Sequence, residues 1–446
     1  MNKSWNRKQL TKMLFHSFVG TIADNAIEIG WILCFSLLAD KKLVEDITVL
    51  FGVNDAFWVV LSLTYYTAKT SLSAILPKLI EEQGINVESK IVKNHIYIFY
   101  AILLPLAILS WIFLPELLIL LGVKETEFSL YIPYFKLSII SLIFFAPWSA
   151  FIPSYLRTRG RTKEGAILDH LNAWSMLFGI FITTHIFNLG VNVALVVNML
   201  ANGIPLYWFL WKKPIPNFFK KGFEFSFIEI KRAWNLMKWE FLRKLAPRLA
   251  TIFGITLMVN LNPIYVGIKY WVLNMFMFVE GWIVSLSELL NSHISRNIGL
   301  KEKNPNKDNE FLFKKTVIGI LINVFVIYLI SKYLLFFLPD EIYQGLINIY
   351  IYIFATIEFI TKCRCYLWFS VSRTYSQNIN GIIQVVFLIP SIFLNPLLLW
   401  LFLYKTNIGL SSIFLAPAIV GITQFLIIEL LFKEKLLTNK SNNATI

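Results

Sequence analysis

Long apolar runs recur along the whole 446-residue chain. The hydrocarbon core of a bilayer is about 30 Å thick, and a helix needs about 20 apolar residues to cross it. Only 15% of the residues are charged and the mean hydropathy is +0.63, whereas a soluble domain carries about 25% charged residues. The sequence therefore predicts an all-α, polytopic membrane protein with about twelve transmembrane helices, at residues 13–38, 47–75, 94–121, 129–154, 165–188, 191–211, 240–262, 264–291, 312–338, 344–371, 378–403 and 409–432.

The basic residues are distributed unequally between the two sides of this arrangement. The two tails and the even-numbered loops contain 28 Lys and Arg, and the odd-numbered loops contain five: Lys41, Lys42, Lys124, Lys332 and Lys405. Loops rich in Lys and Arg stay in the cytoplasm. We therefore expect both termini to be cytoplasmic and the protein to lie in the cytoplasmic (inner) membrane. The net charge of +14 then reports topology, and no nucleic-acid partner is expected.

The longest predicted loop divides the chain into two similar halves. An N-terminal six-helix lobe is expected over 1–211, a cytoplasmic linker over 212–239 and a C-terminal six-helix lobe over 240–446. Residues 144–162 align with 356–374 at a shift of 212, and both segments end in Arg-Thr. Such internal repeats are typical of transporters, whose two halves move about a central site. In the linker, Lys and Arg alternate with Phe and Trp, which suits contact with an anionic leaflet.

The charged stretch LRTRGRTK, residues 156–163, resembles a loop of the multidrug and toxic compound extrusion (MATE) family. That loop typically reads Leu-Arg-Gly-x-Gly-x-Thr-Lys, and only Thr158 departs from it. Leu189-Gly190-Val191 is similar to the Leu-Gly-Val with which the family opens its next helix. MATE proteins belong to a superfamily that also contains oligosaccharide-lipid and polysaccharide flippases. The resemblance implies two pseudo-symmetric six-helix lobes and antiport by alternating access. Within the loop we expect Gly160 to form a tight turn and the basic side chains to contact lipid phosphates.

Two acidic residues of the first helix are the leading candidates for ion coupling. Ionisable groups inside a membrane are costly, so each is a functional hypothesis by default. Asp24 and Glu28 are one turn apart and share a helix face. The family places an acid here within Asn-x-x-Asp, and Asn25-Ala26-Ile27-Glu28 resembles that pattern. We therefore expect Glu28, aided by Asp24, to bind H⁺ or Na⁺, with Asn25 lining the cavity. The alternative is a structural ion pair with a basic residue on another helix.

The fifth predicted helix departs from the family pattern. The family's Asn and Asp would fall at Met176 and Ile180, and neither side chain binds a cation. Asp169 and Asn172 lie nearer the cytoplasm on the same helix, and we expect them to line the cavity instead.

The second lobe carries both acidic and basic candidates. Glu280 and Glu358 are expected as second-lobe coupling groups, although Glu358 and Lys362 have the i,i+4 spacing of an intrahelical pair. Glu240 is expected to reach Lys244 in the same way. Four basic residues then remain without an intrahelical partner and are expected to line the cavity: Arg243, Arg248, Lys269 and Arg364.

These charges leave two functions open. An acidic, aromatic cavity suits an exporter of small amphipathic cations, whereas cationic walls suit a flippase for a lipid-linked sugar or another anionic amphiphile. We favour the MATE-like exporter. A P-loop, an HExxH helix and a zinc-type Cys/His spacing are absent, so no enzymatic activity, metal or cofactor beyond the coupling ion is expected. Cys34, Cys363 and Cys365 fall in apolar segments and are expected to be buried thiols. The expected partners are the substrate and membrane lipids, and the expected state is a monomer.

Overall fold

The structure is a computed structural model of the chain. It describes residues 5–36, 41–120, 125, 128–189, 191–215, 218–261, 263–302, 304–334, 340–375, 377–406 and 408–438. Within these ranges some helices are described by their backbone alone, chiefly over 24–60, 246–256 and 431–438.

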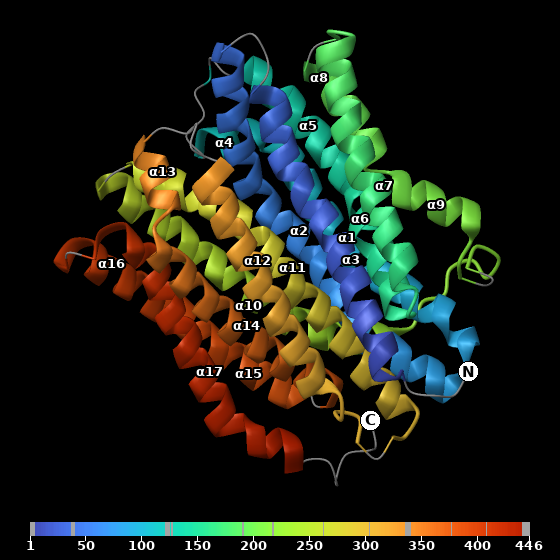
Figure 1. The fold of residues 1–446 in the computed structure, drawn as a ribbon. Coiled ribbons are helices and arrows are strands. Elements are labelled where there is room, and N and C mark those ends of the chain that lie inside the picture. The colour runs from blue at the N-terminus through green and yellow to red at the C-terminus, as the bar shows by residue number, and fades with distance from the viewer. Residues whose placement is uncertain are drawn as a thin grey trace. The chain divides into compact units, whose positions relative to one another are not determined.

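Every regular element in these ranges is a helix (Figure 1). Seven helical segments are long and apolar enough to cross a membrane: Ile85–Ile112, Tyr131–Thr158, Thr162–Ile186, Asn192–Lys212, Asn309–Tyr333, Gly381–Lys405 and Ser412–Leu430. Five further helices, α1, α2, α10, α11 and α14, each have 27 residues or more. At a rise of about 1.5 Å per residue, each of these is also longer than the hydrocarbon core is thick. The all-α, polytopic membrane class is therefore confirmed, and the count of twelve spans stays a prediction.

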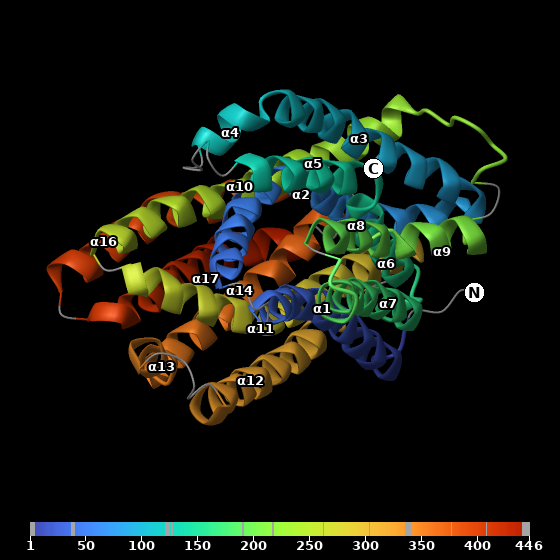
Figure 2. The ribbon, with the colours of Figure 1, turned by 90° about the horizontal axis from the view of Figure 1, so that it is seen from above.

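The chain forms two compact units, which we describe separately. The first unit comprises Phe15–Trp234. Within it α2 packs against α3 and α6, and α7 packs against α6 and α8, as Figure 2 shows for α6 and α7. Its elements are α1 (Arg7–Ser36) from Phe15 onward, α2 (Lys41–Gln83), η1 (Ile85–Val87), α3 (Glu88–Ile112), α4 (Leu114–Leu120), α5 (Phe128–Phe144), α6 (Ala146–Thr158), α7 (Thr162–Phe181), η3 (Ile182–Ile186), α8 (Val191–Ala201) and α9 (Ile204–Lys212).

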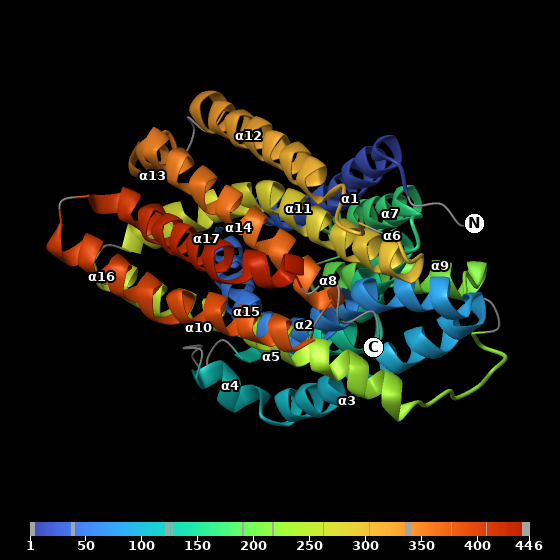
Figure 3. The same ribbon diagram turned by 90° about the horizontal axis from the view of Figure 1, so that it is seen from below.

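The second unit comprises Met1–Leu14 and Asn235–Ile446. In it α14 is the central helix and packs against α11, α12 and α17 (Figure 3). Its elements are α10 (Phe227–Leu261) from Asn235 onward, α11 (Pro263–Gly299), α12 (Asn309–Leu334), α13 (Asp340–Leu346), α14 (Ile349–Tyr375), α15 (Gln377–Ile389), η4 (Pro390–Leu394), α16 (Asn395–Lys405), η5 (Gly409–Ser411) and α17 (Ser412–Thr438).

The start of α1 belongs to the second unit because its apolar side chains are buried there. Leu10 and Leu14 are 0% and 2% exposed and lie in the same core cluster as residues of α11 and α14. Arg7 Nε lies 3.0 Å from Asp308 Oδ1. Residues 5–14 thus pack with the second unit, and the predicted lobe bounds of 1–211 and 240–446 stay a prediction.

The segment Phe218–Ser226, here called the strap, is fixed to α3 by polar contacts. The Glu224 carboxylate accepts hydrogen bonds from Ser89 at 2.7 Å and from Lys93 at 3.1 Å. Asn94 donates to the Glu224 carbonyl at 2.9 Å and accepts from the Ser226 N–H at 2.8 Å. Part of the expected cytoplasmic linker is thus a docked element of the first unit.

Candidate functional site

The charged loop between α6 and α7 begins with a buried ion pair. Arg157, in the last turn of α6, pairs with Asp169 of α7, and their side chains are 7% and 2% exposed. A Cβ added to Gly20 of α1 would lie 2.4 Å from the Asp169 carboxylate and 2.8 Å from the Arg157 guanidinium. A glycine at position 20 therefore lets α1 approach the pair directly, and the pair joins three helices of the first unit.

The two following arginines of this loop also have carboxylate partners. Arg159 Nε lies 2.8 Å from the Glu88 carboxylate, which also accepts a 2.9 Å hydrogen bond from the Tyr155 hydroxyl. Arg161 Nε donates to Glu164 at 2.7 Å. Each of the three guanidiniums thus binds a carboxylate, and the expectation that this basic cluster contacts lipid phosphates stays a prediction. The expected turn at Gly160 is confirmed by its φ of +79°.

A cluster of uncharged polar side chains lies deeper in the first unit. The Asn172 amide donates to the Asn202 oxygen at 3.4 Å, and the Asn202 amide donates to the Ser141 hydroxyl at 3.4 Å. Asn172 is 5% exposed and Asn202 is 9% exposed. The side-chain oxygens of Asn172 and of Asn198, one turn before Asn202, accept no hydrogen bond from any residue whose side chain is described. Buried polar atoms are almost always paired, so these two oxygens are free to bind a hydrogen-bond donor or a cation.

The first helix passes beside this polar cluster. Ala23 of α1 packs in one apolar cluster with Ala173 and Met176 of α7 and with Ala201 of α8. Ala173 and Ala201 directly precede or follow members of the polar cluster along the chain. Ala23 of α1 therefore packs against the chain neighbours of Asn172 and Asn202. The side chains of the predicted coupling residues Asp24, Asn25 and Glu28 lie outside the described residues.

The apolar substitutions in the fifth predicted helix are explained by packing. Met176 and Ile180 are 7% and 0% exposed, so they fill the interior at the positions where the family pattern has polar groups. Of the two expected cavity residues on α7, Asp169 is held by Arg157, whereas Asn172 keeps its oxygen free.

A buried ion network joins α10, α14 and α15 in the second unit. Glu240 is 1% exposed and binds two arginines that are themselves buried. Arg373 Nη2 lies 2.5 Å from Glu240 Oε1, and Arg243 Nη2 lies 2.9 Å from Oε2. The Gln384 amide also donates to Oε1, at 2.8 Å. The network extends to Tyr366, whose hydroxyl accepts from Arg243 at 3.0 Å. Two guanidiniums thus share a single carboxylate.

This network corrects one expectation about α10. Glu240 was expected to pair with Lys244, with which it does interact electrostatically, and to leave Arg243 free for the substrate. Instead, Arg243 is the hydrogen-bonded partner of Glu240, because a spacing of three residues is also favourable on a helix. Arg373 reaches the same carboxylate from α14. Arg248 lies outside the residues whose side chains are described.

The remaining second-unit candidates form a balanced group. Lys362 Nζ lies 2.9 Å from the Glu358 carboxylate, which confirms the predicted intrahelical pair. Lys269 interacts electrostatically with Glu358, and Glu280 interacts electrostatically with Lys362. Glu280 is exposed on the surface of this unit. Two acids and two bases therefore share one region.

Arg364 is paired with carboxylates from two other helices. Its guanidinium lies 2.6 Å from Glu429 of α17 and 2.5 Å from Glu310 of α12. The expectation that Arg364 lacks a partner holds only within its own helix, and the structure makes it a cross-link between helices.

Sequence reasoning missed Arg373 and Gln384. The available signal was the repeat, since the Arg161-Thr162 pair recurs as Arg373-Thr374 in the aligned segments. Arg161 of the first unit is exposed, whereas Arg373 of the second unit is buried against Glu240. The shared Arg-Thr pattern therefore did not reveal that Arg373 is part of a buried ion network.

The described residues thus form two helix-rich units, each with buried polar side chains. Comparison with solved structures finds the same fold over nearly the whole chain. A mutant of the Vibrio cholerae MATE transporter VcmN is 18% identical and matches over 98% of each chain with a TM-score of 0.81. A multidrug resistance MATE transporter of the MOP superfamily in an outward-facing conformation gives a TM-score of 0.82 at 14% identity, over 98% of this chain and 97% of that one. A MOP superfamily transporter from Pyrococcus furiosus, described as having a binding pocket of reverse polarity, gives 0.80 at 13% identity, with the same coverage.

No protein-family model and no curated protein matches the sequence. At these identities the likeness concerns the fold. The predicted resemblance is confirmed at that level: this chain has the fold of MATE transporters of the MOP superfamily.

Proposed function

We propose that this protein is a secondary active transporter that exports small amphipathic compounds in exchange for H⁺ or Na⁺ by alternating access. The observation that carries the coupled mechanism is the polar cluster of the first unit. It offers two buried oxygens, on Asn172 and Asn198, without a hydrogen-bond donor. The chain neighbours of Asn172 and Asn202 pack against Ala23 of α1, which directly precedes Asp24 and lies five residues before Glu28. Carboxylate, amide and hydroxyl oxygens are the ligands that hard cations prefer.

In this mechanism the α1 acid binds the proton or cation in one conformation and releases it in the other. A ligand shifts a conformational equilibrium only through its differential affinity for the two states. Movement of α1 against α7 would change the surroundings of Glu28 and so supply that difference. The protein would lie in the cytoplasmic membrane with both termini in the cytoplasm.

The test is uptake of a fluorescent lipophilic cation into inside-out membrane vesicles energised with H⁺ or Na⁺. We expect gradient-driven uptake by the wild type and its loss in Glu28→Gln. Asn172→Ala should weaken it about tenfold, as one lost ligand of about 1.4 kcal/mol would. Glu164→Gln is the matched control, because it removes an exposed carboxylate from the same unit, and it should transport normally.

A second function is favoured by the second unit. Its buried network contains two arginines for one carboxylate, and cationic groups suit the phosphates of a lipid-linked sugar or a similar anionic amphiphile. Absence of cation uptake with either gradient would count against the exporter. Transbilayer movement of a fluorescent lipid-linked phosphate in reconstituted vesicles would then support the flippase.

A further inference from the structure

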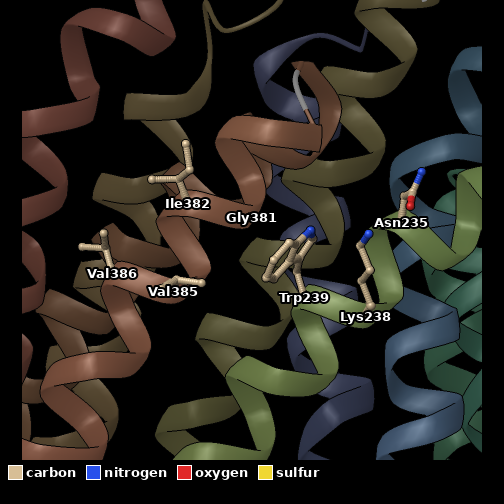
Figure 4. A pocket seen from close by; sticks show the side chains of 7 residues that line it. All are labelled: Asn235, Lys238, Trp239, Gly381, Ile382, Val385 and Val386. Atoms are coloured by element: carbon tan, nitrogen blue, oxygen red, sulfur yellow. The ribbon is translucent and has the colours of Figure 1, made fainter.

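A pocket of about 480 Å³ opens between α10 and α15 in the second unit. One side is formed by Asn235, Lys238 and Trp239 of α10, and the other by four residues of α15: Gly381, Ile382, Val385 and Val386. Figure 4 shows Lys238 and Trp239 on one helix and Ile382 and Val385 on the facing one. Ligand pockets commonly measure about 300–1,000 Å³, so the volume is sufficient for a small headgroup.

The α10 side of the pocket presents donors that have no hydrogen-bond or ion-pair partner in the part of the chain that the structure describes. Residues 235, 238 and 239 have the spacing that places them on one helix face. Among the described residues, the Lys238 ammonium makes no ion pair, and its described contact is with the Trp239 ring, 5.5 Å from the ring centroid. The Trp239 indole N–H and the Asn235 amide donate no hydrogen bond to any described residue. A buried or half-buried indole N–H usually finds an acceptor. The pocket therefore offers a positive charge and two neutral donors, and its lining contains no carboxylate.

The α15 side is apolar and continues along the membrane-spanning segment. The span Gly381–Lys405 begins at this pocket. Ile382, Val385, Ile389 and Phe393 are 54%, 40%, 51% and 69% exposed and follow one another at helical spacing. At a rise of about 1.5 Å per residue this stripe is about 16 Å long. This apolar stripe leads from the donors of α10 along the candidate membrane span, where a hydrocarbon tail can pack against it.

We propose that this pocket binds an amphipathic anion with one phosphate or carboxylate headgroup and a hydrocarbon tail. The headgroup contacts Lys238 and the Trp239 N–H, and the tail lies along Ile382 and Val385. Lysine binds phosphate as a point charge, and anionic lipids attract basic groups at a membrane boundary. The ligand is a membrane phospholipid or a single-chain amphiphile. The site is separate from the proposed coupling site on α1 and α7. Ligand binding to it can be measured directly, without a transport assay.

The test is native mass spectrometry of the full chain released from a neutral detergent. Dioleoyl phosphatidylglycerol, dioleoyl phosphatidylcholine, dodecyl phosphate and inorganic phosphate are the probes. We expect phosphatidylglycerol or dodecyl phosphate, or both, to bind with a one-to-one stoichiometry. If phosphatidylglycerol binds more tightly, the ligand is a membrane lipid. If dodecyl phosphate binds more tightly, the ligand is a single-chain amphiphile. Equal binding of phosphatidylcholine, or of inorganic phosphate, would overturn the proposal.

Four variants locate the site. Lys238→Gln should weaken binding about tenfold, which corresponds to about 1.4 kcal/mol, and Lys238→Arg should preserve it. Gly381→Ala should also weaken it, because the new Cβ would lie 2.8 Å from the indole ring of Trp239 and displace that ring, with its N–H, from its place in the pocket lining.

Lys405→Gln is the matched control. Lys405 also lies over a tryptophan, 5.7 Å from the Trp400 ring, in the same unit but away from the pocket, so its loss should leave binding unchanged. Equal weakening by the changes at Lys238 and Lys405 would mean that the anion responds only to overall charge, and it would overturn the proposal. If Gly381→Ala fails to elute as a monodisperse protein, the comparison of the two lysine variants still decides.

Discussion

Replacing Glu240 by glutamine removes the single carboxylate between two buried arginines and leaves the shape of the side chain almost unchanged. Arg243 and Arg373 are 3% and 4% exposed, so neither guanidinium would regain water. Breaking a buried ion pair by removing one partner costs about 3–5 kcal/mol. For a unit of this size each kcal/mol lowers Tm by about 2–4 °C, so we expect Tm to fall by about 10 °C.

The protein carries its own reporters for this measurement. Cys363 and Cys365 are 0% and 1% exposed and lie on α14, the helix that also carries Arg373. A thiol-reactive fluorogenic dye will label them only when this helix opens. A Cys34→Ser background leaves these two thiols as the reporters, and the midpoint of labelling on heating gives Tm.

Two comparisons make the Glu240 prediction specific. Glu310→Gln removes a carboxylate that is 60% exposed and also binds an arginine, and exposed pairs contribute at most about 1 kcal/mol. In the Glu240→Gln background, Arg373→Gln should cost about 2 kcal/mol less than in the wild type, because it then removes an unpaired charge. The reasoning is refuted if Glu240→Gln lowers Tm no more than Glu310→Gln does, or if the two changes at 240 and 373 are additive.

Three further predictions concern other parts of the molecule. Asp169→Asn should destabilise the first unit by about 3–5 kcal/mol, because Arg157 stays buried without its carboxylate. Hydrogen exchange in α6 and α7 should rise accordingly, and a double variant with Arg157→Gln that exchanges no more slowly than Asp169→Asn would contradict this. Burial raises the pKa of Glu224, but the hydrogen bonds from Ser89 and Lys93 and nearby positive charge outweigh it, so the pKa is lowered overall. The carboxylate therefore stabilises the strap above the ordinary glutamate pKa of about 4.3, and this is lost as the pH falls through the lowered value. Hydrogen exchange in the strap, corrected for intrinsic rates, should rise below that pH, and Glu224→Gln should show the fast rate already at neutral pH. Cysteines placed at positions 163 and 405 should react with an impermeant maleimide from the cytoplasmic and the outer side, respectively, and labelling of both from one side would contradict the topology.

The membrane class could be predicted from the sequence because bilayer thickness imposes a minimum length on every apolar run. The loop LRTRGRTK also indicated the fold correctly, since Gly160 adopts the positive φ that the turn requires. These features depend on spacing along the chain, which the sequence displays directly.

Pairing of the charges could not be predicted in the same way. A helix shows which residues share its own face, so the pair of Glu358 and Lys362 was foreseen. It does not show which residue of a distant helix faces the same point, and for this reason the partnership of Glu240 with Arg373, 133 residues away, was missed.

The sequence by itself determined that the chain spans a membrane, repeats internally and carries acids in its first helix, because hydrophobicity and periodicity are local properties. The tertiary structure alone decided which charges are neutralised and which polar groups remain open. It binds the arginines of the conspicuous basic loop to carboxylates. Among the described residues, it leaves the oxygens of Asn172 and Asn198 without a hydrogen-bond donor and the ammonium of Lys238 without an ion pair. The physical reason is that the desolvation of a charge is offset only by a partner brought into contact in three dimensions.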